Sequence, residues 1–299
     1  MNLSIDDDNS IKYIEAKTIL SKYKEQDSWF GISYSMNLYR GCQHGCIYCD
    51  TRSECYGIND ISKISVKQNA IELLNKELSS KRKIKSTIGT GSMNDPYMPL
   101  EKELEMTRKA LEVIAQKKFP VHIITKSNLV ERDYDLIQEI SKTYAAVSFT
   151  ITTFEDALSQ IIEPFSPESS MRFDAMKFLA QKGIYTGITL MPILPFINDT
   201  QENIKSIINK AKDCGASYIF PAFGVTLRKG SRDFFYQALD TSFKTMKEKY
   251  NNAFGKQYVC SSPNHKKLQD IFEEETYKLG ISQKIEFFSP KEEPQLSLF

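Results

Sequence analysis

Three cysteines, Cys42, Cys46 and Cys49, lie within one short segment of this chain with the spacing C-x-x-x-C-x-x-C. Cysteine thiolates are ligands for iron-sulfur clusters, and a [4Fe-4S] cluster normally takes four of them. Three thiolates would therefore leave one iron open to a ligand that the protein does not supply. This spacing constrains the fold because it requires a loop that turns tightly around a metal centre, and Gly41 and Gly45 suit such a loop.

Two other interpretations of the cysteines are open. A tetrahedral zinc site would recruit Cys55 as its fourth ligand, or the thiols would bind no metal at all. Zinc sites usually consist of two separated pairs of Cys or His, whereas here three thiols crowd into one loop and no His pair follows. The spacing therefore favours the cluster.

The cysteine spacing, with Tyr48 directly before the third cysteine, resembles that of the radical S-adenosylmethionine (radical SAM) superfamily. The resemblance implies two cofactors, a [4Fe-4S] cluster and S-adenosylmethionine bound to its open iron. It also implies that an electron from the cluster cleaves S-adenosylmethionine to a 5'-deoxyadenosyl radical, so an electron donor is an expected partner. The cofactors would carry the difficult chemistry and the protein would position them.

Apolar strand-like runs alternate with amphipathic helical stretches, which indicates an α/β fold with a parallel sheet. The expected strands are 32–38, 84–88, 121–125, 146–151, 186–190 and 218–220. The expected helices between them are 66–78, 101–116, 135–142, 169–182 and 201–214, with Gly183 and Gly215 where helices should stop. Together with the resemblance, this pattern predicts a partial (β/α)6 TIM-like barrel with a helical C-terminal extension.

The alternation also suggests how the chain divides. We expect an N-terminal extension at 1–28, the barrel at 29–225, a helical cap at 226–288 with helices 233–250 and 264–279, and a flexible tail at 289–299. Sites in barrel folds gather at the carboxyl ends of the strands. Because the cysteine loop follows the first expected strand, the fold and the cluster indicate the same active face.

Composition excludes some classes of function. The chain has 39 basic and 38 acidic residues, so no global charge favours nucleic acid or membranes, and any contact with DNA must be local. No run of about 18 apolar residues predicts a membrane span, and the first residues are polar and acidic. We therefore expect a cytoplasmic protein with reduced thiols and no membrane partner.

Polar residues follow the later strands. The segment 89–101 brings Ser92, Asn94 and Asp95, which offer hydrogen bonds to a ligand, although a helix-entry turn would also use them. Lys126 and Thr150 end the third and fourth strands, where the lysine could meet a carboxylate or remain solvated. Arg172 suits bidentate binding of a carboxylate, although arginines on helix surfaces often have no specific partner.

Four segments narrow the resemblance to the branch related to spore photoproduct lyase, described as DNA repair photolyase-like. They are 37–42 with the cysteine loop, 94–97 with Pro99 and Glu101, 162–164 with Arg172, and 191–195, within a resemblance that covers about residues 30 to 280. The resemblance implies that Tyr48 lies against the adenine of S-adenosylmethionine. It also makes six residues candidate cofactor contacts: Ser92, Asn94, Asp95, Lys126, Thr150 and Arg172.

One departure from this branch concerns the hydrogen donor. Spore photoproduct lyase returns a hydrogen atom to its product from a cysteine near the end of the second strand, and this chain has no cysteine between Lys85 and Tyr97. Tyr97 is the candidate catalytic residue that could serve as a relay instead, although many tyrosines only pack. The same hydrogen relay on thymine dimers is therefore not expected.

The last five residues, 295–299, resemble the short peptide by which many bacterial DNA-processing proteins bind the replication sliding clamp. A free chain end after a stretch containing Pro and Glu is expected to be extended, so its apolar side chains can enter a groove of a partner. Leu296, Leu298 and Phe299 would be the anchors and Gln295 the polar determinant. Packing of this end onto the barrel is the alternative.

These observations lead to two hypotheses from different classes. The first is a lyase-like radical SAM enzyme that acts on DNA, in lesion repair or base modification, and is brought there by the clamp. An enzyme of the same superfamily that modifies a peptide, RNA or a metabolite is its enzymatic alternative. The second is a non-catalytic iron-sulfur module that binds DNA or the clamp.

Overall fold

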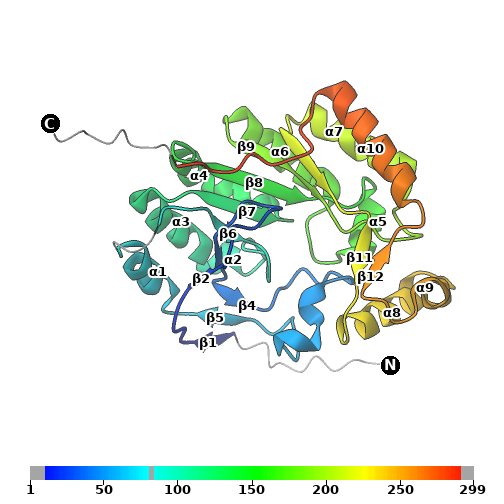
Figure 1. The fold of residues 1–299 in the computed structure, drawn as a ribbon. Coiled ribbons are helices and arrows are strands. Elements are labelled where there is room, and N and C mark those ends of the chain that lie inside the picture. The colour runs from blue at the N-terminus through cyan, green and yellow to red at the C-terminus, as the bar shows by residue number, and fades with distance from the viewer. Residues whose placement is uncertain (1–10, 81–83, 291–299) are drawn as a thin grey trace.

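The computed structural model describes residues 11–80 and 84–290 of the chain. Its centre is a seven-stranded sheet with the spatial order β10-β9-β8-β7-β6-β3-β2 (Figure 1). All neighbouring strands are parallel except β2 and β3, which are antiparallel. The strands are β2 (Leu20–Lys22), β3 (Tyr34–Met36), β6 (Ile88–Thr90), β7 (Val121–Thr125), β8 (Ala145–Thr150), β9 (Tyr185–Leu190) and β10 (Tyr218–Pro221).

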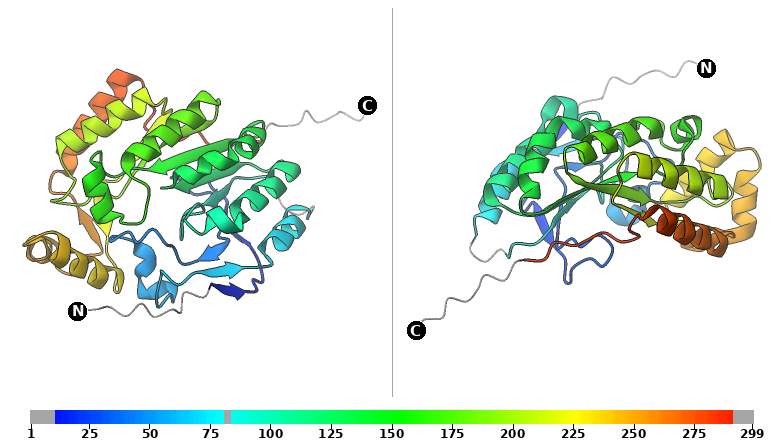
Figure 2. Two further views of the ribbon diagram at one scale, coloured as in Figure 1. Left: turned by 180° about the vertical axis from the view of Figure 1, so that it is seen from behind. Right: turned by 90° about the horizontal axis from the view of Figure 1, so that it is seen from above.

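Helices connect the parallel strands and cover one face of the sheet (Figure 2). They are α1 (Ala70–Leu78), α2 (Glu101–Leu104), α3 (Met106–Lys117), α4 (Tyr134–Ser141), α5 (Asp156–Ile162), α6 (Ser169–Gln181) and α7 (Gln201–Asp213). Gly183 and Gly215 follow α6 and α7 with φ of 78°, a backbone conformation that ends a helix and suits glycine. Six parallel strands with crossover helices confirm the predicted partial (β/α)6 barrel.

The helical extension is also present. It consists of α8 (Ser231–Ser242), α9 (Met246–Phe254) and α10 (His265–Leu279), and it includes a hairpin of β11 (Gly224–Thr226) and β12 (Val259–Ser261). Helix α10 packs on α7, and its Leu268 and Phe272 belong to the main hydrophobic core. Helices α8 and α9 form a second core with the cysteine loop, in which Phe235 and Tyr250 are fully buried.

Several predicted boundaries were wrong. The second strand was expected at 84–88 and lies at 88–90, because Ile84 is exposed and the first buried apolar residue there is Ile88. The helix expected at 66–78 begins only at Ala70, because β5 (Ser65–Lys67) pairs with β1 (Lys12–Ile14) and β4 (Tyr39–Arg40) in a separate three-stranded sheet.

Two predicted helices are interrupted. The one expected at 101–116 is divided between α2 and α3, because Glu105 has a φ of 53°. The one expected at 233–250 is divided between α8 and α9, with Thr245 at a φ of 63° between them. A non-glycine residue with positive φ does not continue an α-helix, and apolar periodicity alone did not reveal these breaks. None of the described helices combines the length and the apolar character that crossing a bilayer requires.

Candidate active site

A cavity of about 390 Å³ lies at the carboxyl ends of the parallel strands. All three cysteines of the predicted cluster line it, together with residues from the loops after five strands. Nine of the predicted site residues lie in its wall: Cys42, Cys46, Tyr48, Cys49, Ser92, Asn94, Asp95, Lys126 and Thr150. The structure therefore brings together most of the residues that sequence reasoning selected.

The cysteine loop turns tightly and is held from outside. Gly41 and Gly45 have φ of 95° and 69°, and a Cβ atom would come within 2.7 Å of the Ile61 oxygen and 2.6 Å of the Phe165 ring, respectively. The backbone amide of Cys42 donates to Ile61 at 2.8 Å, and the backbone amide of Phe165 donates to His44 at 3.2 Å. The loop conformation thus depends on glycine at both positions.

The chemistry of the three thiols fits a metal centre. Burial raises the pKa of Cys42 to about 11 and also raises the pKa of Cys46, so both thiols keep their protons at neutral pH until a bound metal displaces those protons. Cys55 lies outside the cavity, is exposed, and accepts a hydrogen bond from Arg228 at 3.4 Å. No three His, Cys, Asp or Glu residues in ranges 11–80 and 84–290 are spaced to hold a single metal ion.

Asp95 connects the cysteine loop to the ends of two strands. Its carboxylate accepts hydrogen bonds from the Thr125 hydroxyl at 2.7 Å and from the backbone amides of Lys126 and Tyr97 at 2.7 and 2.9 Å. His44 lies 3.4 Å from the same carboxylate. Burial acts to raise the pKa of Asp95, but His44 and these donors lower it to about 2. Asp95 lines the cavity as predicted, and its oxygens already position protein groups.

A second set of charges, which we call the cavity cluster, consists of Tyr48, Lys126, Glu163 and Arg172. The Tyr48 hydroxyl donates to Glu163, and the Arg172 guanidinium lies 2.5 Å from the other Glu163 oxygen. Burial acts to raise the pKa of Glu163, but the positive charges of Arg172 and Lys126 bring it below its ordinary value. Glu163 is fully buried and lies behind the cysteine loop, where it fixes the Tyr48 ring.

Lys126 lines the cavity, as Tyr48 of the same cluster does. Its ammonium group lies 5.7 Å from the centre of the Tyr48 ring. Burial acts against its charge, but the acidic groups around it, the Cys46 thiol when ionised and the carboxylates of Glu163 and Asp95, outweigh burial and raise its pKa. Its ammonium group makes no hydrogen bond or ion pair with any residue in the part of the chain that the structure describes. It is therefore a charged group able to bind a carboxylate.

Arg172 does not lie where the sequence prediction placed it. It is absent from the cavity wall and fully buried, and its guanidinium donates to the backbone oxygens of Thr150 and Pro167 at 2.9 and 2.8 Å. With Glu163 as its ion partner and no exposed surface, it does not reach the space where a ligand would bind. We correct its role from cofactor contact to support for Glu163.

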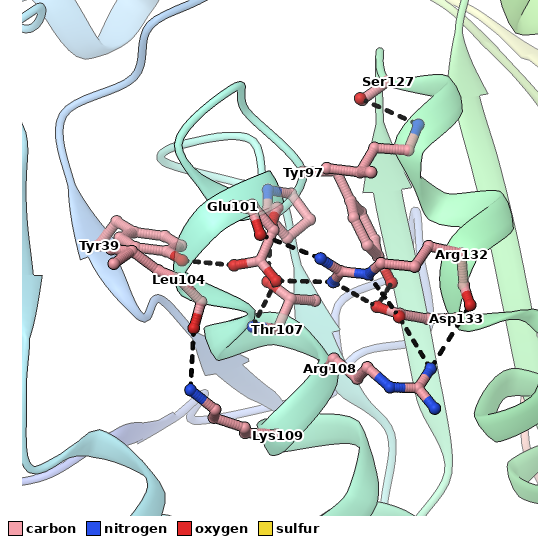
Figure 3. A network of polar contacts seen from close by, with 12 residues as sticks. Tyr39, Tyr97, Glu101, Leu104, Thr107, Arg108, Lys109, Ser127, Arg132 and Asp133 are labelled. Carbon is pink, nitrogen blue, oxygen red and sulfur yellow. Dashed lines mark hydrogen bonds and ion pairs between the residues drawn. The ribbon is translucent and has the colours of Figure 1, made fainter.

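Tyr97 also lies away from the cavity wall. Its ring is fully buried, and its hydroxyl donates to Asp133 at 3.1 Å (Figure 3). Asp133 belongs to what we call the outer network, whose other members are Tyr39, Glu101, Arg108 and Arg132. This placement argues against Tyr97 as a hydrogen relay, because its hydroxyl points into the outer network.

The remaining predicted contacts have partial hydrogen bonding of their own. The Ser92 hydroxyl lies 3.2 Å from that of Ser35, and the Thr150 hydroxyl lies 2.9 Å from that of Thr189. The Asn94 amide donates to the backbone oxygen of Tyr39 at 2.6 Å. Each residue has polar capacity left for a ligand, so their predicted contact with the cofactor stays a prediction.

Sequence reasoning missed part of the cavity wall. Trp29, which precedes β3, and four residues that follow β10, Ala222, Gly224, Val225 and Thr226, also line it. Met191 and Pro192 also line the cavity, and they belong to a segment that carried the resemblance. Trp29 lacked a signal because it lies outside any periodic element, in a turn between β2 and β3.

Comparison with known proteins identifies the class. Residues 36–211 match the Radical SAM superfamily, and this chain belongs to that superfamily. It is accordingly an enzyme whose cofactors are a [4Fe-4S] cluster and S-adenosylmethionine. Cys42, Cys46 and Cys49 are the residues that would hold the cluster, and the alternatives of a zinc site and of a non-catalytic module are not retained.

Two relatives show how far the similarity in sequence extends. An uncharacterized protein of Methanocaldococcus jannaschii is 34% identical over 244 residues, which are 81% of this chain and 88% of the relative. A protein of Pseudomonas phage M6 named radical SAM Nalpha-GlyT isomerase is 25% identical over 185 residues, which are 61% of this chain and 37% of the phage protein.

The fold is that of spore photoproduct lyase. The structure of that enzyme in complex with dinucleoside spore photoproduct has a TM-score of 0.65 and 15% identity, and the match covers 89% of this chain and 78% of the other. A variant of the same enzyme, solved with bound S-adenosylmethionine and the dinucleoside, has a TM-score of 0.66 and 14% identity, with the same coverage. At this identity the likeness concerns the fold alone.

Proposed function

We propose that this radical SAM enzyme acts on DNA, on a damaged or modified base, and that the sliding clamp brings it to its substrate. The observation that carries the proposal is a single cavity whose wall contains the three cysteines, Lys126 and Trp29. One comparison supports DNA as the substrate: the chain shares the fold of an enzyme that was solved with a dinucleoside photoproduct.

When bound, the cluster and S-adenosylmethionine supply a 5'-deoxyadenosyl radical that takes a hydrogen atom from the substrate. The protein's own residues bind and orient. Lys126 offers its ammonium group to the carboxylate of S-adenosylmethionine, and Glu163 holds the Tyr48 ring in place beside it. Ser92 and Thr150 offer hydroxyl groups from neighbouring strand ends. Cys55, Cys214 and Cys260 lie outside the cavity wall.

The substrate class is tested by anaerobic turnover. The reconstituted, reduced enzyme is given S-adenosylmethionine and, in parallel, undamaged DNA, DNA carrying defined lesions, RNA, or a peptide mixture. We expect one class of altered DNA to increase formation of 5'-deoxyadenosine above the level without substrate and to be converted. If only the peptide mixture or only RNA increases formation of 5'-deoxyadenosine, then that class of molecule, and not DNA, is the substrate.

The clamp proposal rests on residues 295–299, which lie outside the described residues. Their order, Gln295, Leu296, Ser297, Leu298 and Phe299, supports it because it supplies a polar determinant and three apolar anchors. Removal of 295–299 is expected to abolish binding to a bacterial sliding clamp in a surface-binding assay and to leave formation of 5'-deoxyadenosine unchanged. The matched control is Ser297→Ala, which keeps every anchor. Equal clamp affinity of the truncated and full chains would end this part of the proposal.

A further inference from the structure

The chain has a single tryptophan, Trp29, and it lines the same cavity as the three cysteines. It follows β2, and its ring lies 5.2 Å from that of Phe220 on β10 in a T-shaped contact. Strands β2 and β10 are the two edges of the main sheet. Trp29 therefore lies where the two edges of the incomplete barrel face each other.

The turn that carries Trp29 is held rigidly. The Asp27 carboxylate accepts hydrogen bonds from the backbone amides of Trp29 and Phe30 at 3.0 and 2.6 Å. Gly31 has a φ of 66°, and its amide donates to the backbone oxygen of Asp27 at 2.9 Å. The neighbouring ring of Phe30 packs against Phe220 at 5.7 Å. The position of Trp29 is thus fixed by its own turn and by the opposite edge of the barrel.

Although it is held in this way, Trp29 is 51% exposed. A T-shaped contact does not cover both faces of two rings, as parallel stacking of several rings would. Burying a large aromatic ring is favourable, so a fixed and half-exposed ring in the wall of a cavity provides a surface for a flat, apolar partner. Nucleobases are such partners, and stacking on aromatic side chains accepts any base because every base has a π-face.

We propose that Trp29 is the platform on which a base of the substrate stacks at the open side of the barrel. This inference rests on the proposed function and names the part of the substrate that the cavity recognises. The stacked ring lies in the compartment that the cysteines and Lys126 also line, so stacking places the nucleotide in the space where hydrogen abstraction occurs. The platform recognises a planar ring and does not by itself distinguish one base from another.

Tryptophan fluorescence of the reconstituted enzyme tests the proposal directly, because all tryptophan emission comes from Trp29. The probe is the dinucleotide thymidylyl-thymidine, added anaerobically in increasing concentration. We expect a saturable change in emission, and no change with the abasic deoxyribose phosphate used as a control. If thymidylyl-thymidine leaves the emission unchanged and an aromatic peptide alters it, base stacking is overturned, and Trp29 instead stacks on an aromatic side chain of a peptide.

Variants separate stacking from simple packing. Trp29→Leu is expected to raise the dissociation constant of labelled thymidylyl-thymidine about tenfold or more, whereas Trp29→Phe keeps an aromatic face and most of the affinity. Tyr277→Leu is the matched control, since Tyr277 lies on α10 outside the cavity wall and is 87% exposed. Cluster absorbance verifies that each variant is folded. Equal affinity of Trp29→Leu and the unaltered enzyme would contradict the proposal.

The failure of the platform and the failure of the proposed function give different results. Should lesion DNA stimulate 5'-deoxyadenosine formation equally in the unaltered enzyme and in Trp29→Leu, the platform is wrong and DNA remains the substrate. Should thymidylyl-thymidine bind through Trp29 while no DNA stimulates turnover, the platform stands and the proposed reaction on DNA is wrong.

Discussion

The cavity cluster and the outer network are both buried groups of charge, and they differ in what is left unpaired. In the outer network, Arg132 contacts Glu101 and Asp133 at 2.8 Å each, and Arg108 contacts Asp133 at 3.1 Å (Figure 3). Arg108 also contacts Asp135, outside this network, at 2.9 Å. Every cation in the outer network has a carboxylate. In the cavity cluster, Arg172 is paired with Glu163, but the ammonium group of Lys126 has no ion partner among the described residues.

This difference gives the outer network a structural role and the cavity cluster a role in ligand binding. A fully paired network stabilises the packing of α2, α3 and α4, and removing one of its members leaves a buried charge uncompensated. An unpaired cation in a cavity wall contributes little to folding and is available to an anionic ligand. Substitutions in the outer network should therefore change the stability of the fold, whereas substitution of Lys126 should change the affinity for a ligand.

The largest effect is expected from Arg172→Met. Both Arg172 and its partner Glu163 are fully buried, so the substitution leaves a buried carboxylate without its strongest cation. We expect a loss of about 3–5 kcal/mol in the free energy of unfolding, which lowers the melting temperature by about 10 °C. Thermal unfolding by circular dichroism measures it. The double variant Glu163→Gln with Arg172→Met should recover much of the loss, and a single variant as stable as the parent would refute the pairing.

A crossed pair of substitutions gives the next largest effect. Lys126→Met is expected to raise the dissociation constant of S-adenosylmethionine about tenfold or more and to keep the melting temperature, because it removes a binding charge. Arg132→Met is expected to lower the melting temperature by several degrees and to keep that dissociation constant, because Arg132 serves the outer network. Equilibrium dialysis measures the dissociation constant of each variant, and thermal unfolding measures its melting temperature. The reverse pattern would show that the roles of the two regions are assigned wrongly.

A further effect concerns the pH dependence of stability. It depends on His122, a buried residue whose two ring nitrogens both have hydrogen-bond partners. His122 lies 3.1 Å from the backbone oxygen of Phe30 and 2.7 Å from the Ser148 hydroxyl, and burial lowers its pKa to about 4. The unfolded chain binds the proton near pH 6.5, so the stability is fully present above that pH and is lost as the pH falls towards 4.

Lowering the pH from 6.5 to 5 should therefore remove about 1.5 kcal/mol from the free energy of unfolding. The measurement is urea unfolding at a series of pH values. His122→Asn, which removes the titrating ring, should flatten the dependence in this window. An equally steep loss in the variant would assign the titration to another group.

The cysteines show what sequence could predict. The spacing of Cys42, Cys46 and Cys49 is local, and the chemistry of thiolates limits what a short loop of three can do, so the family and both cofactors followed from it. The barrel followed from alternating strands and helices, because each apolar period reports the burial of its own segment. The ends of the strands then gathered Ser92, Asn94, Lys126 and Thr150 into one wall.

Arg172, Tyr97 and Trp29 show what sequence could not predict. Whether a side chain faces a cavity or an ion partner depends on contacts between distant segments, such as Arg172 with Glu163 or Tyr97 with Asp133. Trp29 entered the wall because the edges β2 and β10 face each other, a property of the sheet that its own turn does not encode.

The most direct test of the account is the formation of 5'-deoxyadenosine under anaerobic conditions, with reconstituted and reduced enzyme, with and without lesion DNA. The account expects product from the unaltered protein, an increase with one DNA lesion, and no product from Cys46→Ala, which removes one of the three thiolates. Cys214→Ala is the matched control, because Cys214 lies outside the cavity wall. Product formation that survives in Cys46→Ala would contradict the account.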